Sequence, residues 1–383
     1  MARILLGVTG GVAAFKGVLL LRELQRAGHQ VRVVLTRSAT RFVGAPTFHA
    51  LCGEAPFVDG WDMSRTQGGE LHIDLADWAD ALVVYPATYN TVGRVAAGLA
   101  DDLLSLVFVA FSGPRLLCPA MHHAMAGQAL HAGALDALRA AGVRVLEPEV
   151  GVLASGEVGL GRLPEPSVAA EAVEALLCPQ DLEGCRMMVT AGPTREPVDA
   201  VRFLSNPSTG RMGYAVARVA ARRGADVTLI SGPVSLEAPP GVRLVRVGSA
   251  AEMAKAVRAA FADVDVVVMA AAVADSTPAT TTARKLKKAE LPDSLPLRAT
   301  EDILEGLGRA RAGQFLVGFA METGDLVANA QGKLERKNLD LLVANDLGVP
   351  GAGFATATNV VTLLAPGRPP EPLALMSKEA VAS

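Results

Sequence analysis

The chain contains a long polar stretch whose side chains and backbone are suited to holding an anionic ligand. It covers residues 190–213, TAGPTREPVDAVRFLSNPSTGRMG, between a short apolar strand at 187–189 and a helix expected to begin near Arg211. Prolines stiffen this stretch, glycines let its backbone approach a ligand, and threonine, serine and asparagine supply donors. A helix N-terminus behind such donors favours phosphate. Because ordinary strand-to-helix connections need only about 2 to 6 residues, we predict a ligand-binding loop.

A second candidate anion site follows the first strand, in the sequence GVTGGVAAFK at residues 7–16. The turn at 9–11 lies where a strand ends and a helix begins, so free backbone N–H groups face a bound anion. The dinucleotide fingerprint is missing, and no acidic residue follows Thr36 at the end of the second strand to hold a ribose. We therefore favour a mononucleotide. Residues 86–88 end another strand in the same way, although helix capping without a ligand would also explain either turn alone.

Strand and helix patterns alternate along the chain, which predicts an α/β fold with parallel sheets covered on both faces. The length of 383 residues suggests two domains, a doubly wound flavodoxin-like unit at 1–179 and a Rossmann-like unit at 184–383. The stretch GVLASGEVGLGRLPEP at 151–166 is weakly periodic, and we assign no element to it. The expected strands are 4–8, 31–35, 81–85, 115–118, 143–146, 187–190, 227–231, 243–247 and 264–270, and the expected helices are 13–27, 91–99, 167–177, 211–223 and 250–262.

Composition excludes several classes of partner. The 36 Lys and Arg residues nearly balance the 39 Asp and Glu residues, so no strong field favours nucleic acid or an anionic membrane. The four cysteines lack CxxC spacing, which indicates reduced thiols in the cytoplasm, and we expect Cys118 to be a core residue. Because no apolar segment reaches about 18 residues and no signal peptide is apparent, we expect no membrane span.

Ordered motifs over nearly the whole chain resemble the bifunctional coenzyme A biosynthesis proteins, in which phosphopantothenoylcysteine decarboxylase is fused to phosphopantothenate–cysteine ligase. In the first half the matching segments are GVTGGVAAFK, HIDL, YPATYNTVGRVAAGLADDLL and PAMHHAM. In the second half they are TAGPTREP, SNPSTGRMG, AAAVAD, RKLKK, VGFAMET and RKNLDLLVAND. The resemblance implies that the chain condenses 4′-phosphopantothenate with L-cysteine at the expense of CTP. It then implies decarboxylation of 4′-phospho-N-pantothenoylcysteine to 4′-phosphopantetheine.

For the first half the resemblance implies an FMN-binding decarboxylase. His72 occupies the position of the active-site base, and a neutral imidazole is able to take the thiol proton of the substrate near neutral pH. The phosphate and ring of FMN would lie at the three strand ends. The implied contacts are Thr9, Gly10, Gly11, Thr36, Pro86, Ala87 and Thr88.

For the second half the resemblance implies a ligase that activates a carboxylate as an acyl-cytidylate before the amine attacks. Asn206 would contact that intermediate, Lys285 the triphosphate and reacting centre, and Asp275 a Mg²⁺ ion, which prefers oxygen ligands. From composition alone a solvated basic loop is the favoured interpretation of the Lys285 segment, since most lysine clusters face water, and the resemblance reverses that preference. The segment Thr300-Glu301-Asp302-Ile303 departs from the family's usual Asn-Pro-Asp-Ile. The implied nucleotide contacts are Met269, Ala270, Ala271, Asp275, Lys285, Glu301, Asp302, Ile303, Leu304, Phe319, Lys333 and Lys337.

Two departures from the family fall on catalytic positions of the decarboxylase half. His122 replaces the asparagine that grips the substrate carboxylate, and an imidazole still offers one hydrogen bond there. Ser155 replaces the cysteine that protonates the enethiol intermediate. A thiol has a pKa near 8.5, whereas a serine hydroxyl is a far weaker acid, so we expect this proton transfer to slow.

Three readings stay open at this point. The first is a full bifunctional enzyme that tolerates both changes. The second is an active ligase joined to an impaired decarboxylase that keeps FMN as a structural ligand, and the third is a flavin-binding regulatory module without activity. The resemblance also implies a homo-oligomer, with trimers formed through the flavin domain and dimers through the ligase domain.

Overall fold

A computed structural model of the protein describes residues 1–60, 65–66, 69–290, 293–322, 326–346, 353 and 356–383, so that the segment VGFAMET ends, at Thr323, outside the described residues. The chain divides into two compact units, Met1–Cys178 and Pro179–Ser383. Each is described by itself. Among the described residues, no helix has the length and apolar character that a membrane span requires.

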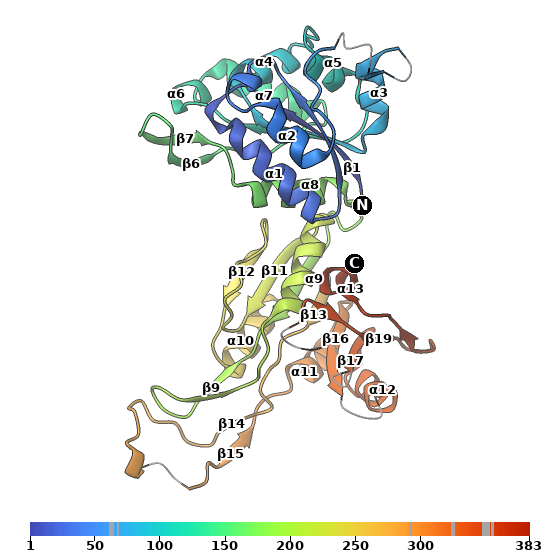
Figure 1. Ribbon diagram of the computed structural model, residues 1–383. Coiled ribbons are helices and arrows are strands. Elements are labelled where there is room, and N and C mark those ends of the chain that lie inside the picture. The colour runs from blue at the N-terminus through green and yellow to red at the C-terminus, as the bar shows by residue number, and fades with distance from the viewer. Residues whose placement is uncertain (61–64, 67–68, 291–292, 323–325, 347–352, 354–355) are drawn as a thin grey trace. The chain divides into compact units, whose positions relative to one another are not determined.

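The first unit contains a parallel five-stranded sheet of order β2-β1-β3-β4-β5, which is the flavodoxin-like order that the strand pattern predicts. Alternate residues of β1 enter opposite cores: Ile4 and Leu6 pack on one face and Leu5 on the other. Helices cover both faces (Figure 1). The strands are β1 (Arg3–Val8), β2 (Gln30–Leu35), β3 (Ala81–Ala87), β4 (Arg115–Pro119) and β5 (Arg144–Val145).

Helix α1 follows the first phosphate-type turn, and α8 packs against it from the end of the unit. Cys118 is fully buried in β4, as expected of a core residue, and burial raises the pKa of its thiol. The helices are α1 (Phe15–Arg26), α2 (Ala45–Cys52), α3 (Leu71–Trp78), α4 (Tyr89–Ala96), α5 (Leu103–Ala110), α6 (His123–Ala126), α7 (Ala129–Ala140) and α8 (Pro166–Leu177), with short 3₁₀ turns at Val12–Ala14 and Ala39–Arg41.

The weakly periodic stretch to which we assigned no element forms an antiparallel hairpin, β6 (Glu149–Val152) and β7 (Val158–Arg162). Its apolar residues alternate with period two, but Val150 and Val158 are each 70% exposed. The pattern was weak because the hairpin belongs to no buried sheet, so hydrophobic burial does not select one of its faces.

The second unit contains an eight-stranded sheet of order β12-β11-β8-β13-β16-β17-β19-β20. The first six strands are parallel, whereas β19 and β20 are antiparallel additions at one edge. The expected parallel sheet is thus found with an antiparallel edge that was not expected, and the short connection 365–370 explains why β20 runs antiparallel to β19. The strands are β8 (Arg186–Ala191), β11 (Asp226–Ser231), β12 (Arg243–Arg246), β13 (Val266–Met269), β16 (Phe315–Glu322), β17 (Leu341–Asp346), β19 (Val361–Leu364) and β20 (Glu371–Pro372).

Two small hairpins leave the sheet of this unit. One, β9 (Arg195–Pro197) with β10 (Phe203–Ser205), lies inside the polar stretch 190–213. The other, β14 (Ser276–Pro278) with β15 (Leu297–Ala299), begins a long arm that extends away from the sheet (Figure 1). The helices are α9 (Arg211–Arg222), α10 (Ala250–Phe261), α11 (Ile303–Ala310), α12 (Leu326–Arg336) and α13 (Lys378–Ala382), with a 3₁₀ turn at Lys288–Glu290 and a short pair, β18 (Thr358–Asn359) with β21 (Met376–Ser377).

Candidate functional sites

The carboxyl ends of β1, β2 and β3 form the rim of one pocket in the first unit. Gly10, Thr36 and Thr88 line it, together with Ser38. A side chain at position 10 would place its Cβ 2.3 Å from the Cβ of Ser38, so the turn needs glycine there. Among the described residues, the backbone N–H groups of Gly10 and Ser38 have no hydrogen-bond acceptor. Two adjacent free N–H groups at strand ends form a cradle suited to a phosphate.

Thr9 and Ala87, which we expected among the ligand contacts, lie behind this rim. Both are fully buried. The Thr9 hydroxyl donates to the carbonyl of Pro86 at 2.8 Å and accepts the backbone N–H of Thr88 at 3.0 Å. Thr9 therefore joins the two strand-end turns to each other. Its hydroxyl proton is engaged by Pro86 and is not directed at a ligand.

A second pocket lies under the β6–β7 hairpin. Gly11, Pro86 and Thr88 line it from the strand ends, and His122 and Ser155 line it from the loop before α6 and from the hairpin. The structure thus places His122 and Ser155, the two residues that differ from the family's catalytic residues, in the same pocket.

His72 lies elsewhere, in the adjoining pocket with Thr36. It begins the first turn of α3, is half-buried, and its Nε2 lies 3.9 Å from Glu70 Oε2. Thr88 and Met121 line both pockets, so the two cavities are neighbours with a shared wall.

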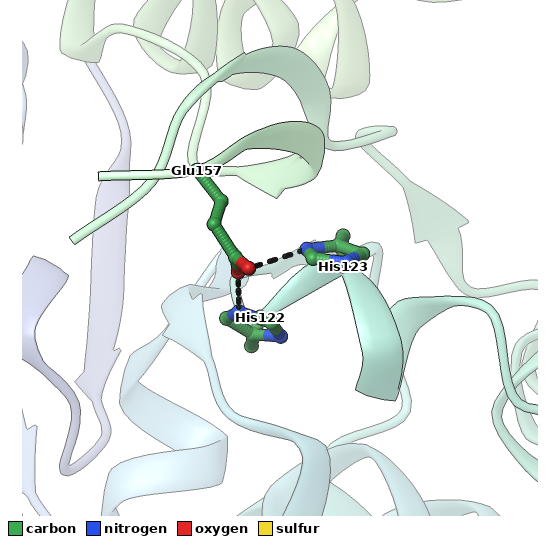
Figure 2. A group of neighbouring side chains, drawn as sticks. All are labelled: His122, His123 and Glu157. Atoms are coloured by element: carbon green, nitrogen blue, oxygen red, sulfur yellow. Dashed lines mark hydrogen bonds and ion pairs between the residues drawn. The ribbon is translucent and has the colours of Figure 1, made fainter. Parts of the chain in front are cut away.

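Figure 2 shows the carboxylate of Glu157 pointing towards the imidazole rings of His122 and His123. Glu157 Oε2 lies 2.6 Å from His122 Nε2 and 3.7 Å from His123 Nδ1. The Ser155 hydroxyl donates to the same oxygen at 3.3 Å. The hydrogen bond from His122 holds the pKa of the Glu157 carboxyl below its usual range. One side-chain atom each of His122, His123 and Glu157, of a kind able to bind a metal ion, lies within 4.8 Å of the other two.

The sequence did not point to Glu157 or His123 as site residues. Glu157 lies 35 residues from His122 along the chain, and only the folded hairpin brings them together. The one local signal is the spacing of two residues between Ser155 and Glu157, which places both in the turn of the hairpin.

One pocket in the second unit lies at the carboxyl ends of the parallel strands. It contains Asn206 from the polar stretch, Asp275 from the segment after β13, and Phe319 from β16. The Asn206 amide donates to the carbonyl of Ala272 at 3.1 Å, which fixes its orientation. The other predicted residues that line this pocket are Met269, Ala270, Ala271, Glu301, Asp302, Ile303, Leu304, Lys333 and Lys337.

The three carboxylates of this pocket have different surroundings. Asp302 caps α11 by accepting the backbone N–H of Glu305 at 3.0 Å, and it pairs with Lys337 at 2.8 Å. Glu301 pairs with Arg258. Asp275 has no cationic partner among the residues that the structure describes, which leaves it the carboxylate best suited to a divalent cation.

Lys285 does not line this pocket. It is exposed on the arm between β14 and β15, next to Leu286. The backbone of Leu286 is held at both ends: its N–H donates to Asp199 at 3.1 Å, and its carbonyl accepts from Arg202 at 2.7 Å. The arm is thus attached to the polar stretch beside Lys285.

Two cations at the pocket were not expected from the sequence. Arg211 begins α9, and Lys378 begins the last helix of the chain. The Lys378 side chain is buried, and its ammonium donates to the carbonyls of Gly353 at 2.8 Å and Thr356 at 2.6 Å. Burial lowers the pKa of Lys378, and the charge of Arg211 acts in the same direction. No short motif marks such a residue near a chain end.

The fold defines a two-domain α/β protein in which a flavodoxin-like domain with pockets at its strand ends precedes a Rossmann-like domain with a charged pocket. The Flavoprotein family matches residues 1–177, and the family described as DNA/pantothenate metabolism flavoprotein C-terminal domain matches residues 182–383. The chain belongs to the family of coenzyme A biosynthesis bifunctional proteins, as its relatives show.

Curated relatives match over nearly the full chain. The coenzyme A biosynthesis bifunctional protein CoaBC of Bacillus subtilis is 43% identical over 379 residues, covering 98% of this chain and 93% of that protein. CoaBC of Mycobacterium tuberculosis is 46% identical over 384 residues, covering 95% and 90%.

Solved structures match one half of the chain each. The crystal structure of the C-terminal domain of a CoaBC protein is 41% identical with a TM-score of 0.46, covering 52% of this chain and 91% of that one. The FMN-dependent cysteine decarboxylase SpaF is 31% identical with a TM-score of 0.42, covering 46% and 95%.

Proposed function

We propose that this chain carries out two consecutive reactions of coenzyme A biosynthesis. The second unit condenses 4′-phosphopantothenate with L-cysteine through an acyl-cytidylate formed from CTP. The first unit decarboxylates the resulting 4′-phospho-N-pantothenoylcysteine to 4′-phosphopantetheine with FMN. The observation that supports this most directly is 43% identity over 98% of the chain to a protein named as bifunctional in coenzyme A biosynthesis.

The residues of the first unit fit FMN. The N–H groups of Gly10 and Ser38 would hold its phosphate, with Thr36 beside them. Gly11 and Pro86 would face the ring, where a Cβ at position 11 would approach only Thr88, at 3.4 Å. When bound, FMN accepts a pair of electrons from the cysteine end of the substrate and later returns it. His72 would take the thiol proton.

The residues of the second unit fit a nucleotide with a divalent cation. Asp275 would hold Mg²⁺, and Lys333 and Lys337 would neutralise phosphate charge. Met269 and Phe319 offer apolar surface for a base. Asn206 is oriented by its bond to Ala272, which leaves its amide oxygen to contact the acyl-cytidylate.

Lys285 would reach the triphosphate from the arm, which its neighbour Leu286 attaches to the Asp199–Arg202 pair. We also propose that the chain acts in the cytoplasm as a homo-oligomer, with trimers through the first unit and dimers through the second.

The test is a product assay with purified protein, FMN, 4′-phosphopantothenate, cysteine, CTP and Mg²⁺, read by mass spectrometry. We expect 4′-phosphopantetheine over many turnovers. Lys285→Gln should abolish pyrophosphate release from CTP, whereas Lys288→Gln in the same basic segment serves as the matched control. Unchanged pyrophosphate release by Lys285→Gln would refute the ligase assignment. Phosphopantothenoylcysteine as the sole product would leave an active ligase joined to an impaired decarboxylase.

A further inference from the structure

Decarboxylation consumes one proton, because hydrogen replaces on carbon the carboxylate that leaves as carbon dioxide. Any electron pair that passes to FMN returns within the same cycle, so the proton is the only net reactant besides the substrate. The pocket therefore needs an acid that water is able to reprotonate after each turnover. This inference rests on the proposed function of the first unit.

Among the described residues, four side chains that line the pocket under the hairpin are ionisable: Lys16, His122, Arg162 and Glu165. Lys16 and Arg162 both pair with Glu165, at 3.0 and 2.5 Å. The bond from Lys16 holds the pKa of the Glu165 carboxyl below its usual range, so Glu165 stays ionised near neutral pH and is paired with both cations. Histidine is the side chain that exchanges its proton in that range, and His122 is the one histidine among these four.

The hydrogen bonds of His122 determine where its protons lie. The backbone N–H of Ala124 donates to Nδ1 at 3.3 Å, so in the neutral ring the proton is on Nε2. That N–H points at Glu157 Oε2, 2.6 Å away (Figure 2). A carboxylate bound to one nitrogen of an imidazole favours a second proton on the other nitrogen. The hydrogen bond from Ala124 N–H to Nδ1 is long and therefore weak. Nδ1 is thus the nitrogen of His122 that gains and loses a proton.

Ser155 is badly placed to be the acid. Its hydroxyl donates to the ionised Glu157 carboxylate at 3.3 Å, and Glu157 N–H donates back to Ser155 Oγ at 3.4 Å. A neighbouring negative charge opposes release of the hydroxyl proton. These contacts orient Glu157 towards His122, so Ser155 is a positioning residue.

We propose that the His122 imidazolium, held by Glu157, is the general acid of the decarboxylation. The N–H bond at Nδ1 breaks as a C–H bond forms at the substrate carbon, and the ring is left neutral. His122 then regains a proton from water, to which its side chain is 37% exposed. Glu157 remains ionised throughout and keeps the ring in place.

His122, His123 and Glu157 could also be read as ligands for a divalent cation. Treatment with EDTA separates the two: decarboxylation of supplied substrate should be unaffected, and its loss would overturn the proposal.

The decisive experiment supplies 4′-phospho-N-pantothenoylcysteine directly to the FMN-loaded full chain, so that the ligase is not needed. His122→Asn should slow 4′-phosphopantetheine formation by about 10²- to 10⁴-fold, the usual contribution of a general acid, and leave the flavin reduced after one turnover. The double variant His122→Asn/Ser155→Cys places a thiol in the hairpin and should recover much of that loss. His49→Asn, on the exposed face of α2, is the matched control.

Glu157→Gln tests the positioning role through the steady-state constants. Among the described residues, Glu157 and His123 are the titratable groups that contact the His122 ring, and loss of the carboxylate should lower kcat for the supplied substrate with little change in KM. An unchanged kcat would overturn this role. Flavin content and ligase rate of each variant report on folding.

Two results would overturn the general-acid assignment alone: full turnover by His122→Asn, or a double variant as slow as His122→Asn. If the unmodified protein fails to decarboxylate the supplied substrate, the proposed function of the first unit fails as well. The two failures are therefore distinguishable.

Discussion

The carboxylate of Asp199 accepts the backbone N–H of Leu286 at 3.1 Å, joining segments 87 residues apart. Arg202 completes the contact, because its guanidinium donates to Asp199 at 3.0 Å and to the Leu286 carbonyl at 2.7 Å. The polar stretch at 190–213 thus holds the arm that carries Lys285.

Asp199→Asn should release this arm. An asparagine cannot form an ion pair with Arg202 and accepts through one oxygen only, so we expect CTP-dependent pyrophosphate release to fall about tenfold, the effect of losing roughly 1.4 kcal/mol of transition-state stabilisation. Asp181→Asn, which removes a surface pair with Arg223, is the control. Equal rates for both variants would show that the tether does not position Lys285.

Lys378→Met should weaken binding of an anionic substrate to the second unit. Its buried ammonium has two carbonyl acceptors but no carboxylate partner among the described residues, so it and Arg211 provide uncompensated positive charge at the pocket. We expect the KM for CTP or 4′-phosphopantothenate to rise about tenfold with a smaller change in kcat. Steady-state kinetics with Lys255→Met, an exposed lysine of α10, checks this. An unchanged KM for both substrates would contradict it.

Gly161→Ala should impair the decarboxylase selectively. Gly161 has φ 137°, and a Cβ there would lie 2.1 Å from the carbonyl oxygen of Met121. The hairpin would have to move away from the loop that carries His122. We expect at least a tenfold loss of decarboxylation of supplied substrate and an unchanged ligase rate. Gly133→Ala, in α7 with nothing within 4 Å, should leave both rates unchanged.

The stability contributed by Asp265 should vanish in acid. Its hydrogen bond to Arg186 lowers the pKa of the Asp265 carboxyl to about 2, below the usual value near 3.9. A carboxyl with a depressed pKa in the folded state stabilises above its unfolded pKa, and that contribution is lost as the pH falls from about 4 towards 2. Asp265→Asn should lower the urea midpoint equally at pH 7 and 5 and progressively less below pH 4. A difference as large at pH 2.5 as at pH 7 would contradict this.

Local patterns carried most of the fold. All five strands of the first sheet are found within one or two residues of their predicted positions, because buried parallel strands read as apolar runs whatever they pack against. The β6–β7 hairpin was not predicted from the sequence, because its valines are exposed and give no one-sided burial pattern. The antiparallel edge at β19 was not predicted, because no strand or helix was assigned beyond residue 270.

The candidate site was predictable only in part. Gly10 and Thr36 sit at strand ends, and strand ends are visible in a sequence. The hydrogen bonds of the Thr9 hydroxyl to the 86–88 turn could not be predicted, because they depend on which turn of the folded chain lies opposite Thr9.

The sequence by itself determined the alternation of strands and helices, the glycine turns that suit phosphate, and the replacement of two family residues by His122 and Ser155. These are properties of local spacing and residue type. Tertiary structure alone decided that Glu157 faces His122, that Leu286 is held by Asp199 and that Lys378 lines the pocket of the second unit. Each contact joins segments separated by tens of residues or more, and its existence depends on how hairpins and helices pack, which no local pattern encodes.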